Sequence, residues 1–310
     1  MGNLERKSKS VAYNLELEVT EISSLRPSVV SLPPLSEFKI RWHVLIPLLI
    51  MHIGAIAAFW FIDLKSILVA ALLWLITGLF GITIGYHRLL THQAFKMPTW
   101  LSRLHIFCGV LAFQLGPITW TRMHRAHHAL SDRPEDPHPQ IYGFWFGHIG
   151  WAFLAHPRIG RSAKFKENPP ELMRDPFLLF CENFAPIIFL SSLGLLYLWG
   201  GLPMLLWAGF FRWVWVSHIT WSVNSFGHWL GYRRFQTSEL SANNPVVALL
   251  AWGEGWHNNH HRFPSSAQQG LAWYEFDASW MWIRFLQKLG LAWEVKTPAI
   301  YAPPPVGPAD

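Results

Sequence analysis

Three groups of histidines stand out in the sequence because of their spacing. They occur in the segments "HRLLTH", "HRAHH" and "HNNHH", and their members are His87, His92, His124, His127, His128, His257, His260 and His261. A neutral imidazole nitrogen is a common metal ligand, and residues three or four apart on a helix share one face. Eight imidazoles are too many for one metal ion. The pattern therefore predicts a pair of metal ions.

Further donors are expected near these groups. In "NSFGH", Asn224 and His228 are one turn apart on one helix face, which adds a ninth histidine and an amide. Carboxylate-bridged di-iron bundles need two ExxH motifs and further glutamates, so Glu254 is interpreted as an outer partner of the metal ligands. His87 and His92 would lie about 140° apart on an ideal helix, which predicts that the helix ends between them.

The remaining histidines have a simpler interpretation. Isolated histidines of an apolar chain are usually hydrogen-bonded packing residues. This interpretation covers His43, His52, His105, His156 and His218.

The elements that carry these residues are expected to lie in a membrane. The 310 residues are 51% hydrophobic and only 14% charged, with a mean hydropathy of +0.20. Four stretches are long and apolar enough to span a bilayer as helices, at about 43–62, 66–86, 179–199 and 202–223. The connectors "DLK" and "GGLP" are short, which predicts two hairpins. The expected fold is all-α, with four transmembrane helices and a cytoplasmic helical cap that holds the histidines.

Charge predicts the orientation. Residues 87–176 hold eleven Lys or Arg, whereas the two connectors hold only Lys65, so both termini and the histidines are expected on the cytoplasmic side. A fifth apolar run, Leu104 to Ile118, is short for a span and is expected to be buried against the membrane or in its interface. One membrane domain is predicted at 36–302, with flexible tails at 1–35 and 303–310. No cleavable signal peptide is expected, and Cys108 and Cys181 are expected to be packed thiols.

The three histidine boxes, with "NSFGH" and "GEGWHNNHH", resemble those of the integral-membrane fatty-acyl desaturases. The likeness extends from about Leu35 to Trp293 and includes "DPH" at 136–138 and "GFWFGHIGW" at 143–151. The resemblance implies an oxidoreductase of lipid metabolism with two iron ions. Such an enzyme uses dioxygen and two external electrons to remove two hydrogens from a long saturated acyl chain. The products are a cis double bond, expected near carbon nine, and two waters.

The resemblance also implies roles for single residues. The nine histidines named above would be the iron ligands, with Asn224 acting through a water. Gln114, Trp120 and Thr220 resemble residues that hold the acyl chain at its bend, and Leu75 and Leu79 match positions that close the tunnel end. Ordinary packing of these apolar and interfacial side chains is the alternative.

The sequence indicates the acyl carrier and the electron donor only in part. Animal acyl-CoA members carry polar residues where this chain has Leu115 and Met123, while Arg122 is retained. "GPITW" is similar to plant and bacterial members, some of which act on glycerolipids, so acyl-CoA and acyl-lipid both stay open. The chain has no GxGxxG, no HPGG and no cysteine set for iron and sulfur. A separate electron donor such as ferredoxin or cytochrome b5 is expected, and a nucleic-acid partner is not.

Two other functions are compatible with histidine clusters. A membrane di-iron hydroxylase of alkanes or acyl chains would use the same oxidant, and its products would distinguish it. A non-enzymatic metal-binding or transport protein would use the histidines to bind rather than to react, and a transporter would need ionisable groups near the middle of the membrane. Arg212, inside the fourth apolar stretch, has no assigned role at this level.

Overall fold

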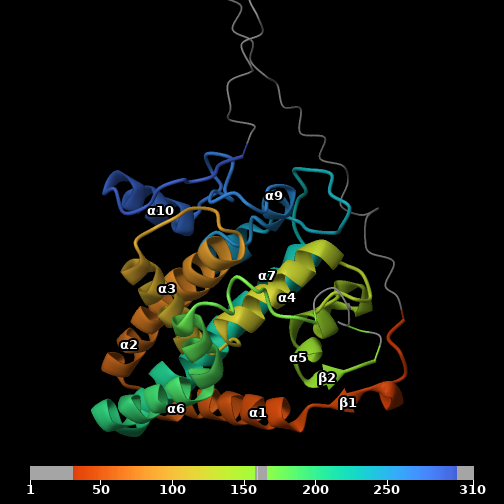
Figure 1. The fold of residues 1–310 in the computed structure, drawn as a ribbon. Coiled ribbons are helices and arrows are strands. Elements are labelled where there is room, and N and C mark those ends of the chain that lie inside the picture. Colours follow the sequence, from red (N-terminus) through yellow and green to blue (C-terminus); the bar gives the residue numbers. More distant parts are fainter. Residues whose placement is uncertain (1–30, 158, 160–165, 299–310) are drawn as a thin grey trace, which may run out of the picture.

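The computed structural model describes residues 31–157, 159 and 166–298, and these are predominantly helical (Figure 1). The α-helices are α1 Trp42–Ala57, α2 Leu64–Trp74, α3 Thr99–Ala112, α4 Pro117–Leu130, α5 Trp151–Phe153, α6 Pro176–Met204, α7 Arg212–Trp229, α8 Pro245–Leu250, α9 His257–Arg262 and α10 Ala278–Lys288. The π-helices are η4 Leu75–Thr91, η6 Phe146–Gly150 and η8 Leu205–Phe211. The 3-10 turns are η2 Leu35–Glu37, η3 Ala58–Trp60 and η5 Gln140–Tyr142. Strands β1 Lys39–Ile40 and β2 Leu154–Ala155 pair antiparallel. The predicted tail 303–310 and most of the tail 1–35 lie outside the described residues.

Three helical segments are long and apolar enough to cross a membrane. They are Trp42–Trp60, Leu64–Thr91 and Pro176–Trp229. A fourth is added if α3 and α4, which meet at 84°, count as one bent span. The chain is thus a helical membrane protein with three to four candidate spans, while the exact set of four spans and their orientation stay predictions.

The second predicted connector coincides with a break in the long helical segment. A continuous helix of 54 residues would be about 80 Å long, far more than a bilayer core of about 30 Å. Gly200 and Gly201 leave helical geometry, and Gly201 has a φ of +66° that favours glycine. Beyond the break, a Cβ at Gly209 would lie 2.8 Å from the Leu193 side chain, so η8 packs back against α6. At the first connector, Asp63 caps α2 by accepting the Ser66 N–H at 2.8 Å.

The fifth apolar run forms most of α3 and the start of α4, with a sharp turn between them. Phe113 has a φ of +51° and ends α3, and Pro117 begins α4. α3 packs closely on η4, because a Cβ at Gly81 would lie 2.5 Å from the backbone of Cys108. The run is therefore not one helix, and its α3 part packs against η4.

Arg212 now has a structural role. Its side chain is buried, and NH1 donates to the Leu111 carbonyl near the carboxyl end of α3 at 3.1 Å. Its Nε donates to the Ala208 carbonyl at 3.1 Å. A cation at the carboxyl end of a helix complements the helix dipole. Arg212 therefore ties α7 to α3.

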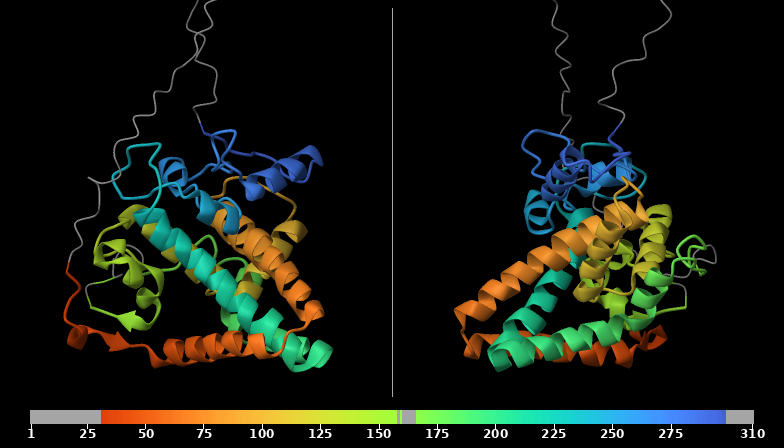
Figure 2. Two further views of the ribbon diagram at one scale, coloured as in Figure 1. Left: turned by 180° about the vertical axis from the view of Figure 1, so that it is seen from behind. Right: turned by 60° about the vertical axis from the view of Figure 1, so that its left-hand side comes forward.

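The long helices converge on one end of the molecule. In Figures 1 and 2, α2 with η4 and α7 rise obliquely from the level of α1 and α6 toward α9 and α10. The histidines of "HRLLTH" and "NSFGH" lie at the ends of η4 and α7, and those of "HNNHH" form α9. Three segments far apart in sequence thus meet at the same end.

Candidate metal centre

The first histidine pair is brought onto one face by a π-helix. η4 continues to Thr91, and the His92 N–H donates to the His87 carbonyl five residues earlier at 3.1 Å. The helix therefore ends between these residues, as expected, although its last turn is π-helical and not α-helical. In a π-helix the i to i+5 hydrogen bond places residues five apart one above the other. The ring centroids of His87 and His92 are 4.7 Å apart.

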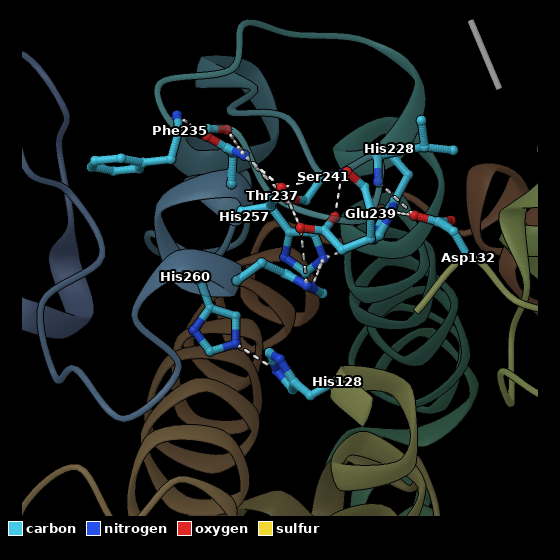
Figure 3. A network of polar contacts seen from close by, with 12 residues as sticks. His128, Asp132, His228, Phe235, Thr237, Glu239, Ser241, His257 and His260 are labelled. Carbon is cyan, nitrogen blue, oxygen red and sulfur yellow. Dashed lines mark hydrogen bonds and ion pairs between the residues drawn. The ribbon is translucent and has the colours of Figure 1, made fainter. Parts of the chain in front are cut away.

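The second and third boxes each divide between two groups. On α4, His124 and His128 are four residues apart and join the first group, whereas His127 joins the second. On α9, His260 joins the first group, and His257 and His261 join the second. His228 at the end of α7 completes the second group, and Asn224 lies one turn before it on that helix. Figure 3 shows His128 facing His260 across the gap between α4 and α9.

All nine predicted histidines fall into two groups that could each hold a metal ion. The first group is His87, His92, His124, His128 and His260, and the second is His127, His228, His257 and His261. Within each group the ligand atoms lie within 4.8 Å of one another.

The distances between the ring nitrogens fit metal coordination. Neighbouring Nε2 atoms are 3.1 Å apart for His87 and His260, and 2.8 Å apart for His260 and His128. Two nitrogens at about 2.1 Å from a metal and at a right angle are about 3.0 Å apart. In the second group, Nε2 of His127 is buried without a hydrogen-bond partner. A metal ion is the kind of partner that such an atom needs.

The opposite nitrogen of most of these rings meets a carboxylate or an amide. Nδ1 of His127 lies 3.0 Å from Asp136, and Nδ1 of His228 lies 2.9 Å from Asp132. Further contacts join Glu254 to His87, Glu239 to His261 at 3.7 Å, and the Gln269 amide to His260 at 3.3 Å. Such contacts orient the rings and fix which nitrogen faces the metal. Figure 3 shows Asp132 and Glu239 beside His228 and His257.

Sequence reasoning identified only part of this outer set. Glu254 was expected as an outer partner because it lies three residues before a box. Asp136 belongs to the "DPH" segment, which marked the family but gave no role. Asp132, Glu239 and Gln269 were missed, because their contacts with the histidines span up to 96 residues along the chain and no spacing rule connects them.

Burial and neighbouring charges shift the pKa values of the α9 histidines and of Asp136. It lowers the pKa of His257, His260 and His261 well below the usual value, which keeps these imidazoles in the neutral form that binds metal. Burial alone would raise the pKa of Asp136. The neighbouring His127 and His138 outweigh it and lower that pKa to about 2. The carboxylate therefore stays ionised and can accept the Nδ1 proton of His127.

Some predicted substrate residues lie beside the first group. The Trp120 ring stacks on His124, with centroids 4.9 Å apart and an interplanar angle of 19°. The Gln114 amide donates to the Thr220 hydroxyl at 3.1 Å. Thr220 also lines a narrow cavity whose wall includes Ile82 on η4 and Glu254, the partner of His87. The cavity thus reaches toward the first group.

The other substrate residues lie further away. Leu75 and Leu79 pack in a hydrophobic cluster with Met97 and Ile283. Neither lines the narrow cavity, but Trp252, which packs against this cluster, does. Arg122 lines a separate cavity of about 400 Å³ that is also bordered by Met123 and Leu154, and it donates to the Lys166 carbonyl at 2.9 Å. Leu115 is 43% exposed at the turn between α3 and α4.

Comparison with known proteins gives concordant matches. Residues 65–293 match the fatty acid desaturase family. The chain is 45% identical to an sn-1 stearoyl-lipid 9-desaturase of Anabaena variabilis over 83% of this chain and 94% of that protein. It is 43% identical to a chloroplastic palmitoyl-monogalactosyldiacylglycerol delta-7 desaturase of Arabidopsis thaliana, over 80% of this chain and 67% of that protein. It is 38% identical to an acyl-CoA 5-desaturase of Anemone leveillei, over 80% and 77%.

Proposed function

Because this chain belongs to the fatty acid desaturase family, and is thus an oxidoreductase that desaturates fatty acyl chains, we propose that it introduces a cis double bond near carbon nine. The acyl chain is proposed to be long and saturated. The observation that carries this proposal is the convergence of nine histidines from η4, α4, α7 and α9 into two adjoining groups.

We propose that each group binds one iron ion. The donor set supports this, since it consists of imidazoles whose Nε2 atoms turn inward and whose Nδ1 atoms have outer partners. The iron pair, when bound, supplies the oxidising power that breaks unactivated C–H bonds with dioxygen. The chain's own part is to hold the metals, orient the acyl chain and exclude water. Asn224 is proposed to join the second centre through a water.

The acyl chain is proposed to bend at Trp120, Gln114 and Thr220. Trp120 supports this role because its ring stacks on His124 and offers a flat apolar surface at the first group. The hydrogen bond from Gln114 to Thr220 joins the turn after α3 to α7 across the same region. The Gln114–Thr220 hydrogen bond would hold the turn after α3 and helix α7 at a fixed separation. The reactive methylenes would then lie against the metals.

Chain length is proposed to depend on Leu75 and Leu79 of η4. Neither lines the narrow cavity, but Gly78 and Ile82 of the same helix do. Leu79 is buried in the cluster that packs against Trp252, another residue of the cavity wall. The volume of the Leu79 side chain would therefore limit how far η4 can move to accommodate a longer acyl chain.

The carrier is proposed to be a glycerolipid, with acyl-CoA as the alternative. The cavity of about 400 Å³ places Arg41, Arg122 and Lys166 beside the apolar Met123 and Leu154. That mixture is compatible with a lipid headgroup and its glycerol backbone. The relative from Anabaena variabilis is named as a stearoyl-lipid desaturase, which supports the same carrier.

The electron donor is proposed to be an acidic one-electron carrier, ferredoxin or cytochrome b5, that docks on the cytoplasmic side. Arg133 and Arg262 are both exposed, and each directly follows a residue of the centre, Asp132 or His261. Opposite charges would speed the encounter and bring the carrier close to the metals.

Expression in a desaturase-deficient host tests the proposed function. Glycerolipids and acyl-CoA are separated, and the fatty acids of each fraction are analysed by gas chromatography with mass spectrometry, beside a His128→Ala control. A new delta-9 monounsaturated acid on glycerolipids, absent from the control, is expected. The double bond at another carbon would overturn the regiochemistry, and product confined to acyl-CoA would overturn the carrier. Hydroxy acids in place of alkenes would favour the hydroxylase instead.

A further inference from the structure

Three histidines outside both metal groups form one hydrogen-bonded line. Nε2 of His52 on α1 lies 2.9 Å from Nε2 of His218 on α7. Nδ1 of His218 lies 2.9 Å from Nε2 of His148 on η6. Nδ1 of His148 lies 2.8 Å from the Ser225 hydroxyl on α7. The interpretation of His52 and His218 as isolated packing residues therefore misses their mutual contact.

At both ends, this histidine line contacts a hydrogen-bond acceptor. At one end, Nδ1 of His52 lies 2.6 Å from the Leu48 carbonyl. At the other end, the Ser225 hydroxyl lies 3.0 Å from the Trp221 carbonyl. A backbone carbonyl accepts a hydrogen bond and never donates one.

A proton count follows from these contacts. The line has five contacts, three between its members and one at each end, and each needs one proton. Three neutral imidazoles and one hydroxyl supply only four protons. A neutral line therefore leaves one contact without a proton, and a fully bonded line carries one additional proton. Shifting the unfilled contact from one end to the other moves a proton along the line.

The rings do not converge as metal ligands do. His218 uses its two nitrogens in two separate contacts, one with each neighbouring ring. A metal site would require one nitrogen from each ring to point at a common centre, as in the two groups described above. The arrangement is that of a line of donors and acceptors.

The histidine line lies partly inside the candidate spans. His52 lies midway along the candidate span Trp42–Trp60, and His218 lies within Pro176–Trp229. Ionisable residues are rare inside spans and usually serve transport of ions or protons. Ser225, the other end, is fully buried and lies three residues before His228 on α7, which is one helical turn. The line thus runs from α1 to Ser225, one helical turn from a member of the second metal group.

We propose that His52, His218, His148 and Ser225 form a proton relay that serves dioxygen reduction at the buried centre. In desaturation, the acyl chain gives up two hydrogen atoms, a one-electron carrier gives two electrons, and dioxygen becomes two waters. Two waters contain four hydrogens, so two protons must also enter in each turnover. The relay supplies these protons while the apolar surroundings exclude bulk water.

The first test replaces the central ring of the relay. His218→Gln keeps one donor and one acceptor but removes the group that passes a proton on. The control is His105→Gln. His105 is buried, and its two nitrogens contact the Leu101 carbonyl and the Trp282 indole, at 2.8 and 3.3 Å, and no other histidine among the described residues.

We expect His218→Gln to lower turnover by about 100-fold, the lower end of what a positioned proton donor contributes. KM for the acyl substrate should stay unchanged, and the solvent deuterium isotope effect on turnover should rise because proton supply becomes limiting. The control should retain the wild-type isotope effect. Wild-type turnover and isotope effect in folded His218→Gln would overturn the relay.

A second measurement needs no turnover and no variant. The ring ¹⁵N resonances of the full wild-type chain are recorded with Zn²⁺, which is diamagnetic, in the metal groups. A relay predicts nitrogen shifts of the three rings averaged between the protonated and unprotonated values, since the proton moves along the line. Fixed shifts, with each nitrogen either protonated or not, would show a structural brace and overturn the proposal.

Discussion

At the residue scale, the outer partners of the histidines decide how firmly each ring is held. Asp136 is fully buried, and its carboxylate meets Nδ1 of His127 as well as the backbone N–H of Asp132 and of His138. Sixteen histidines are present in the chain, yet only nine have this inward arrangement. Spacing singled out these nine as candidate ligands, but it did not predict that the second and third boxes each divide between the two groups.

Asp136→Asn should weaken the second centre. The amide cannot match the charge-assisted contact with His127, and loss of an outer partner typically costs about 10–100-fold in metal affinity. We expect about one of two irons per chain to be lost on dialysis, measured as iron per protein by mass spectrometry. Asp63→Asn, at the cap of α2 far along the chain, is the control. Full iron retention in Asp136→Asn would contradict the role of Asp136.

Leu79→Ala should lengthen the acyl chain that the enzyme prefers. Removing this buried side chain lets the η4 wall move away from the narrow cavity, and the product profile in a fed host measures the effect. Ile82→Ala is the matched variant, because Ile82 lines the cavity directly. If only Ile82→Ala changes the profile, the cavity-lining face of η4 sets chain length and the proposal for Leu79 fails.

At the element scale, the close approach of η4 and α3 depends on glycine. Gly81→Ala should lower the free energy of unfolding by about 1–3 kcal/mol, since its Cβ would meet the Cys108 backbone and backbone cannot rotate away. Thermal unfolding in detergent checks this. Gly194→Ala is the control, because a Cβ at Gly194 on α6 meets nothing within 4 Å. Equal stability of the two variants would contradict the close packing.

The same helix shows where sequence reasoning ends. Hydropathy predicted the apolar stretch 66–86 and the turns at both connectors, because length and composition determine which segments suit a bilayer. The predicted helix end between His87 and His92 agrees with the end of η4 at Thr91, but the π-helical geometry of η4 has no comparable signal in the sequence. The bend of 84° after α3 was also missed, although Gly116 and Pro117 mark its position.

At the scale of the whole molecule, the segment after α8 is joined to η4 by buried ion pairs. Arg88 of η4 is buried and pairs with Glu254 and with Asp277, at 3.1 and 3.0 Å. Glu254 also contacts His87. These contacts join residues separated by up to 189 positions, and no local pattern predicts them. They hold α9 against the ends of the long helices.

Bound metal ions should strengthen the attachment of α9 to the long helices. Each group takes ligands from α9 as well as from the long helices, so a bound ion stabilises the closed form by about 2.7 kcal/mol at a free concentration 100 times its Kd. Removing metal with a chelator should therefore accelerate hydrogen exchange in α9 and in residues 251–256, and zinc should restore protection. α1 contributes no ligand and should exchange equally in both states. Uniform exchange across the chain, with and without metal, would show that α9 is held by the Arg88 contacts alone.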